Sequence, residues 1–262
     1  MASDTTPAQG TPLLRFADGC ATVTLNRPAH HNRLHVEDLL TLRQHLDTVA
    51  QRAGAQVLLL TGTGPSFCSG FDIGSIDAGP NSANAGPRLF EQTVDALEAL
   101  ELPTVCRLNG GVYGGATDLA LACDFRIGVD AVVLRMPAVR LGLHYYPNGL
   151  RRYVSRLGLG AAKRLFMLAE TVPASELLRI GYLDRCVSAA RLDDEVQSVV
   201  DALLAGAPLA LRGMKASLNE IARGEFEPAV LRGREARCAA SDDLREGKAA
   251  FAERRPARFQ GR

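Results

Sequence analysis

The stretch from Asn109 to Asp118 reads Asn-Gly-Gly-Val-Tyr-Gly-Gly-Ala-Thr-Asp, and the fold can be inferred outward from it. The apolar run 104–108 before the glycines predicts a buried strand, and the segment 116–123 after them predicts a helix. The glycines between them permit backbone angles and close approaches that a Cβ atom would forbid. Such a turn brings backbone N–H groups to a helix N-terminus, which favours negative charge. Two interpretations stay open: an anion site, or a tight connection in which Asp118 is only a first-turn charge.

Composition bounds the class of protein. The 262 residues are 47% hydrophobic, enough for a full core, and could form one large domain or a domain with an appendage. Thirty basic and twenty-nine acidic residues give a net charge of +1, so no overall field points to nucleic acid or to an anionic membrane. The six cysteines are scattered without metal-ligand spacing, which predicts buried thiols and no metal site. The polar start and the absence of a long apolar run predict a soluble, cytoplasmic protein.

The chain divides by pattern into two regions. Residues 1–190 alternate apolar runs with amphipathic stretches, which predicts an α/β core that begins with a hairpin around residues 17–19. Residues 74–87 are rich in Gly, Ala, Asn, Pro and Ser and predict a loop over a pocket. Residues 137–152 predict an irregular segment. Residues 191–262 show helical spacing and predict an all-helical region.

Four stretches together resemble the crotonase, or enoyl-CoA hydratase/isomerase, superfamily, in the family's order along nearly the whole chain. They are 23–28 with 32–34, 58–73, 109–125 and 241–256. The resemblance implies an α/β fold, a crotonase-type spiral of ββα turns with a C-terminal helical trimerisation region. It also implies a homotrimer or a dimer of trimers and a site for an acyl-CoA substrate, with no cofactor other than the coenzyme A that the substrate carries.

The resemblance also implies which residues bind the substrate. The backbone N–H groups of Phe71 and Gly115 correspond to the pair that holds the thioester oxygen in this family. Donors fixed in advance at that oxygen stabilise an enolate. The coenzyme A and acyl groups would be held by residues in the matching stretches and by Ala138 in the run 136–142. Those in the matching stretches are Arg27, Arg33, Leu34, Gly70, Gly114, Arg254 and Arg255.

The sequence departs from the family at the acid/base residues. Hydratases of this family use two glutamates; Asp118 stands at the first position and Ala138 at the second. Three interpretations follow: Asp118 is the sole acid/base of a hydratase or isomerase; Tyr145 or His144 supports decarboxylation or hydrolysis; or the protein binds acyl-CoA without turnover. For Tyr145 and Tyr146, packing against the C-terminal helices is the alternative to a role in the site.

Overall fold

The computed structural model describes residues 9–72, 74 and 85–262. The expected loop 74–87 lies mostly outside the described residues, and its last three positions open a helix instead. Asp18 and Gly19 adopt positive φ angles of 47° and 81° between the first two strands, so the predicted hairpin is confirmed.

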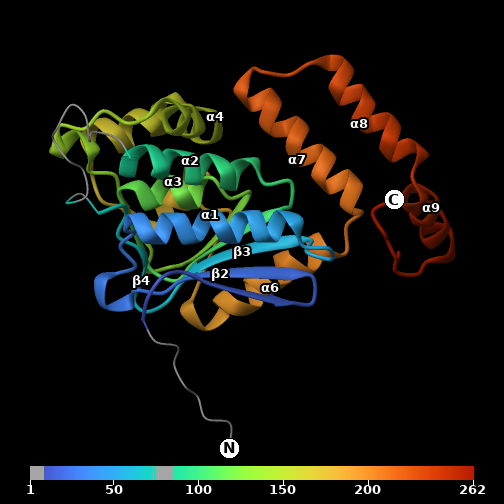
Figure 1. Cartoon of the computed structure of the whole chain (residues 1–262), viewed down its shortest axis with the longest axis horizontal. Helices are drawn as coiled ribbons and strands as arrows, with labels where there is room; N and C mark the ends of the chain where they lie inside the picture. The colour runs from blue at the N-terminus through green and yellow to red at the C-terminus, as the bar shows by residue number, and fades with distance from the viewer. Residues whose placement is uncertain (1–8, 73, 75–84) are drawn as a thin grey trace, which may run out of the picture.

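Three successive ββα turns form the core (Figure 1). In each turn a strand joins a large sheet, a short strand joins a small sheet, and a helix follows. The turns are β3 (Val57–Gly62), β4 (Ser66–Cys68) and α2 (Ala85–Ala99); β5 (Thr104–Leu108), β6 (Gly111–Tyr113) and α3 (Gly115–Leu121); and β7 (Phe125–Val129), β8 (Val133–Arg135) and α4 (Pro147–Lys163).

The two sheets are mostly parallel, as right-handed crossovers between successive turns require. The large sheet has the order β1-β2-β3-β5-β7-β10 and the small sheet β4-β6-β8-β9. Only the β1–β2 and β8–β9 pairs are antiparallel among the described strands. The strands not yet given are β1 (Leu13–Ala17), β2 (Cys20–Leu25), β9 (Val172–Pro173) and β10 (Arg185–Val187).

Helix α1 (Val36–Gln51) buries Leu39, Leu42, Leu46 and Val49 and packs beside α2. The irregular segment predicted over 137–152 is wrong in its second half. A 3₁₀ turn, η3 (Ala138–Leu141), is followed by α4, which begins at Pro147. Proline is tolerated there because the first helical N–H has no intrahelical acceptor. Two 3₁₀ turns, η1 (Pro28–His30) and η5 (Ala189–Arg191), a π-helical turn, η4 (Arg164–Leu168), and α5 (Ala174–Arg179) complete the core connections.

Four helices end the chain: α6 (Leu192–Leu204), α7 (Pro208–Arg223), α8 (Pro228–Ala240) and α9 (Asp242–Glu253). Helix α6 packs on β3, β5 and β7, whereas α7, α8 and α9 form an arm that reaches beyond the core (Figure 1). Helix α7 is tied to the core by Lys215, whose Nζ lies 2.8 Å from an oxygen of Asp124.

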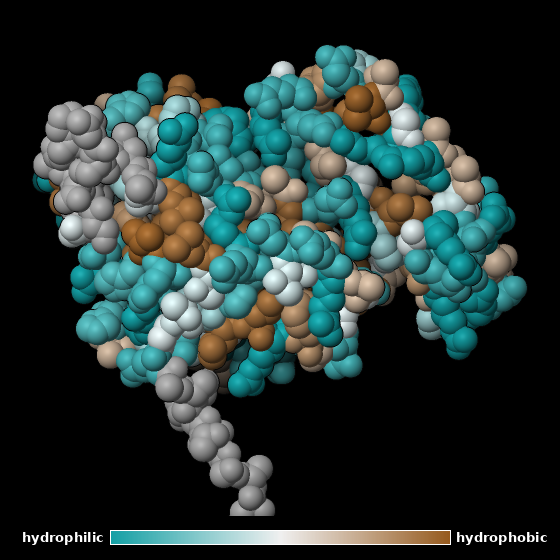
Figure 2. Space-filling view, in the orientation of Figure 1, coloured by the Kyte–Doolittle hydropathy of each residue, from teal (hydrophilic) through white to brown (hydrophobic). Residues whose placement is uncertain are grey.

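Apolar residues interrupt the hydrophilic surface of this arm (Figure 2). Exposed large side chains are Met214, Leu218, Ile221, Phe226, Val230, Leu244 and Phe251. Assembly as a trimer stays a prediction, and these side chains are the ones it would have to cover. None of the described helices combines the length and the apolar composition needed to cross a bilayer.

Candidate active site

A cavity of about 560 Å³ opens where the first two spiral turns meet. The turn after β4, the turn between β6 and α3, the N-terminal half of α2 and the segment from η3 to α4 form its walls. The lining residues are Ser69, Gly70, Phe71, Pro87, Arg88, Phe90, Glu91, Tyr113, Gly114, Gly115, Met136, Pro137, Ala138, Leu141, Leu143, His144, Tyr145 and Tyr146. Seven of the predicted site residues therefore share one cavity.

The Phe71 N–H has no hydrogen-bond acceptor in the part of the chain that the structure describes. Leu34 pairs with Phe71 in a parallel bridge, in which the Leu34 N–H donates to Gly70 O and the Leu34 O accepts from the Asp72 N–H, both at 2.9 Å. Because these bonds use the two neighbours of Phe71, the Phe71 N–H points away from Leu34. This bridge gives the buried Leu34 a structural role behind the cavity.

Gly115 begins α3, so its N–H has no intrahelical acceptor. Gly114 precedes it with φ 53° and ψ −132°, a conformation that excludes most side chains. A Cβ at Gly70 would lie 3.2 Å from Gly115 N, so the two turns are in direct contact. Among the described residues, neither the Gly115 nor the Phe71 N–H has a hydrogen-bond acceptor.

Asp118 lies one turn further along α3 and is fully buried, outside the set of lining residues. Its Oδ2 accepts hydrogen bonds from Tyr146 and from Nη1 of Arg152, the latter at 2.8 Å. Its Oδ1 has no partner among the described residues. Burial raises the pKa of this carboxyl, and the attraction of Arg152 and the bond from Tyr146 oppose but do not cancel that rise.

Both tyrosines line the cavity. Tyr145 stacks on Tyr146 with ring centroids 4.5 Å apart, and the pair packs against Phe166 and Phe90. The Tyr145 hydroxyl is buried without a partner among the described residues. Burial raises the pKa of both phenols well above the ordinary range. Tyr146, which the sequence analysis ranked behind Tyr145, is the one bonded to Asp118.

His144 and Ala138 both reach the cavity. His144 is exposed and its Nδ1 lies 2.9 Å from Tyr145 O. Ala138 contributes only a methyl group to the cavity wall, at the position where the resemblance predicts a second glutamate. The cavity therefore has one carboxylate among its described lining residues, Glu91 of α2, which sequence reasoning missed.

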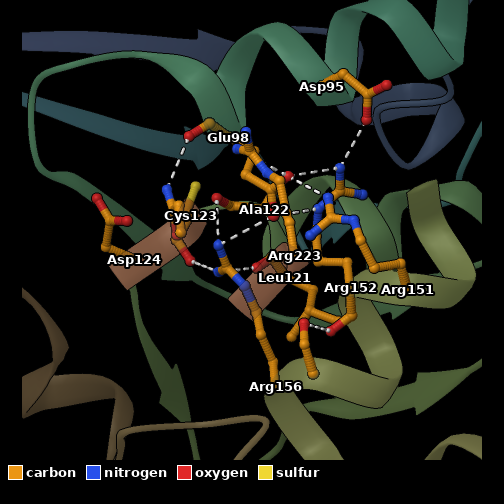
Figure 3. A network of polar contacts seen from close by, with 12 residues as sticks. Asp95, Glu98, Leu121, Ala122, Cys123, Asp124, Arg151, Arg152, Arg156 and Arg223 are labelled. Atoms are coloured by element: carbon orange, nitrogen blue, oxygen red, sulfur yellow. Dashed lines mark hydrogen bonds and ion pairs between the residues drawn. The ribbon is translucent and has the colours of Figure 1, made fainter. Parts of the chain in front are cut away.

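A buried arginine network behind α3 was also missed (Figure 3). The side chain of Arg152 is fully buried and forms ion pairs with Asp95, Glu98 and Asp118 at 2.8–3.0 Å. Glu98 is paired in addition with Arg151, Arg156 and Arg223. Burial opposes ionisation of Glu98, but these cations outweigh it and lower its pKa. The one signal in the sequence for this buried network is the cluster of three arginines within residues 151–156.

The same network caps α3 at its far end. The Arg156 guanidinium donates to the main-chain oxygens of Leu121, Ala122 and Cys123 (Figure 3). A cation at a helix C-terminus offsets the partial negative charge of the unpaired carbonyls.

Most of the arginines predicted to hold coenzyme A form ion pairs with carboxylates of the same chain. Arg27 pairs with Glu37 and Asp38, Arg33 with Asp72, and Arg255 with Glu246 and Glu253. Arg254 and Arg255 directly follow α9, which lies on the opposite side of the molecule from β4 (Figure 1). One copy of the chain does not bring them to its own cavity. No group of metal-binding residues occurs in the described parts of the chain.

Comparison with known proteins places this geometry in a family. Residues 15–262 match the family model of enoyl-CoA hydratase/isomerase. The chain belongs to the enoyl-CoA hydratase/isomerase family. It is 31% identical to a crotonyl-CoA hydratase of Syntrophomonas wolfei, over 94% of this chain and 96% of that one. It is 28% identical to a short-chain-enoyl-CoA hydratase of Clostridium acetobutylicum, over 90% and 92%.

Solved structures agree. An enoyl-CoA hydratase/carnithine racemase from Magnetospirillum magneticum matches with a TM-score of 0.92 at 25% identity, over 97% of both chains. The spiral fold expected from the sequence is therefore confirmed, and acyl-CoA chemistry is what membership of the family supports. At the two positions where the resemblance predicts the acid/base residues, Asp118 is buried and paired with Arg152, and Ala138 lines the cavity.

Proposed function

We propose that this chain binds an acyl-CoA thioester and stabilises its enolate, in hydratase- or isomerase-type chemistry. The observation that carries the proposal is that the Phe71 and Gly115 N–H groups belong to two residues that line one cavity, and that neither has an acceptor among the described residues. Two such donors complement an oxygen that gains charge when the α-carbon loses a proton or the β-carbon gains a nucleophile. The crotonyl-CoA and short-chain-enoyl-CoA hydratases among the relatives suggest the substrate class.

Isomerisation or proton exchange fits the residues better than full hydration. Hydration in this family orients one water between two carboxylates, and here Ala138 cannot carry a proton. Asp118, the remaining candidate acid/base, has no exposed surface in the cavity. Its Oδ2 accepts hydrogen bonds from the Tyr146 hydroxyl and the Arg152 guanidinium. A single proton-carrying route suffices to move a proton on an enolate.

Acyl-CoA binding without turnover is the second candidate function. It is favoured by the ion pair that holds Asp118 away from the cavity. It would show as tight binding across a panel of thioesters with no hydration, isomerisation or α-proton exchange in any of them.

A pair of substitutions tests the anion hole itself. Gly115→Pro removes the N–H at the first helical position, where proline is tolerated. Gly115→Ala keeps the N–H, and in both variants the new Cβ meets the ring of Phe90, 2.7 Å from Cζ. We expect the proline variant to turn over enoyl-CoA about 10²–10³-fold more slowly than the alanine variant, the cost of one anion-hole donor. Equal rates in the two variants would refute the assignment of Gly115.

A further inference from the structure

The candidate acid/base of this site is not in the cavity, which raises the question of how it meets a substrate. Asp118 is 0% exposed, and its one hydrogen bond to a lining residue comes from the Tyr146 hydroxyl. Any proton that travels between Asp118 and the acyl group along the described side chains must therefore pass through Tyr146.

Tyr146 also lies close to the anion hole. Asp118 is three residues after Gly115 on α3, and residues three apart on a helix lie about 5–6 Å apart at Cβ. The Tyr146 hydroxyl is therefore bonded to a side chain in the first turn of the helix that Gly115 begins. The ring of Phe90 lies between Tyr146 and Phe71, the second anion-hole residue. Its centroid is 6.2 Å from that of the Tyr146 ring and 6.0 Å from that of the Phe71 ring.

We infer that Tyr146 is the proton-transfer group that faces the acyl chain, with Asp118 behind it as the terminal proton acceptor. This inference rests on the proposed function. In the forward step the α-C–H bond breaks, the proton binds to Tyr146 Oη, and the phenolic proton moves to Asp118 Oδ2. The electron pair of the C–H bond becomes the enolate, whose oxygen the Phe71 and Gly115 N–H groups hold. Reversal of the relay returns the proton to the α- or γ-carbon, so no co-reactant is consumed.

The neighbours of the dyad suit this role. Hydrogen bonding to Asp118 directs the phenolic proton away from the substrate and leaves the oxygen lone pairs available to accept. Burial makes Asp118 a stronger base than an ordinary aspartate, because its pKa is raised despite Arg152. Gly149 permits the close packing, because a Cβ there would lie 2.4 Å from Tyr145 Cε1 and 2.9 Å from Asp118 Oδ2.

Tyr145, the residue that the sequence favoured, is less suited. Its hydroxyl is buried and has no base to receive its proton among the described residues. Because the two rings stack in one wall of the cavity, Tyr145→Phe and Tyr146→Phe form a matched pair that each remove one oxygen atom. In Tyr146→Phe the carboxylate keeps its bond to Arg152, so the variant should fold, which thermal unfolding can check.

The test is exchange of the α-protons of butyryl-CoA in D₂O, followed by proton NMR, with binding of butyryl-CoA measured separately by calorimetry. We expect wild type to exchange, and Tyr146→Phe and Asp118→Asn each to lose at least about 100-fold in rate with binding retained. We expect the loss in Tyr145→Phe to be less than a tenth of that. Exchange unchanged in Tyr146→Phe, or lost in Glu91→Gln while kept in Tyr146→Phe, would overturn the relay and leave the enolate chemistry standing. No exchange in wild type would instead overturn the proposed function, and the relay with it.

Discussion

Replacing Arg152 by methionine should strongly destabilise the protein. The fully buried guanidinium neutralises Asp118 and shares Glu98 and Asp95, whose side chains are 4% and 30% exposed. Glu98 keeps three other arginines in the variant, but Asp118 is left as a buried charge without a cation partner. Breaking one buried pair costs about 3–5 kcal/mol. We expect the free energy of unfolding to fall by about that amount rather than by twice as much.

Urea unfolding followed by circular dichroism, at one fixed chain concentration, measures this change. Arg232→Met is the matched control, since Arg232 is 80% exposed and pairs with the exposed Glu235, and it should change little. Adding Asp118→Asn to Arg152→Met should recover part of the lost stability, because the amide removes the unpaired buried charge. A cost below about 1 kcal/mol, typical of surface pairs, or no recovery in the double variant would refute the reasoning.

Three further outcomes are expected. Gly149→Ala should destabilise by about 1–3 kcal/mol, the range for overpacked cores, and slow α-proton exchange, because the methyl group would meet the Tyr145 ring; wild-type values for both would contradict the packing. The pKa of Glu98 is lowered in the folded protein, so its carboxylate stabilises the fold above the ordinary glutamate pKa, and this contribution is lost as pH falls through the folded pKa. The free energy of unfolding of Glu98→Gln, measured in urea at several pH values, should therefore depend less on acid pH than that of wild type; the same pH dependence in both would count against this assignment. Phe251→Ser, at a side chain 89% exposed on the arm, should weaken the expected trimer in light scattering, whereas a monomeric wild type would rule the trimer out.

The strand, turn and helix around 104–123 could be predicted because their signals are local. Apolar runs bound by glycines leave few alternatives. The assignment of Phe71 and Gly115 to an anion hole came from the family resemblance, and it stays a prediction. The start of α4 could not be predicted in this way. Pro147, Asn148 and Gly149 have low helix propensity, and the helix is held by tertiary contacts instead.

The surroundings of Asp118 were beyond the sequence for a different reason. The resemblance predicts a carboxylate at this position, but its direction depends on partners about 30 residues away, Tyr146 and Arg152. The sequence does not distinguish a buried arginine from a solvated one, and only the fold shows that Arg152 is buried. Glu91 reaches the cavity from α2, and nothing in the sequence around it distinguishes it from a solvated helical glutamate.

The arginine contacts at the far end of α3 determine how substitutions in the neighbouring helix α4 affect both turnover and stability. Helix α3 has seven residues, so its first N–H and its last carbonyls are about two turns apart. With Arg156 on the last carbonyls and Arg152 on Asp118, the helix is anchored before any substrate arrives, and the Gly115 N–H needs no reorganisation to meet one. Substitutions in α4 that loosen this anchor would therefore lower turnover and thermal resistance together. A screen for either property alone would recover the same positions.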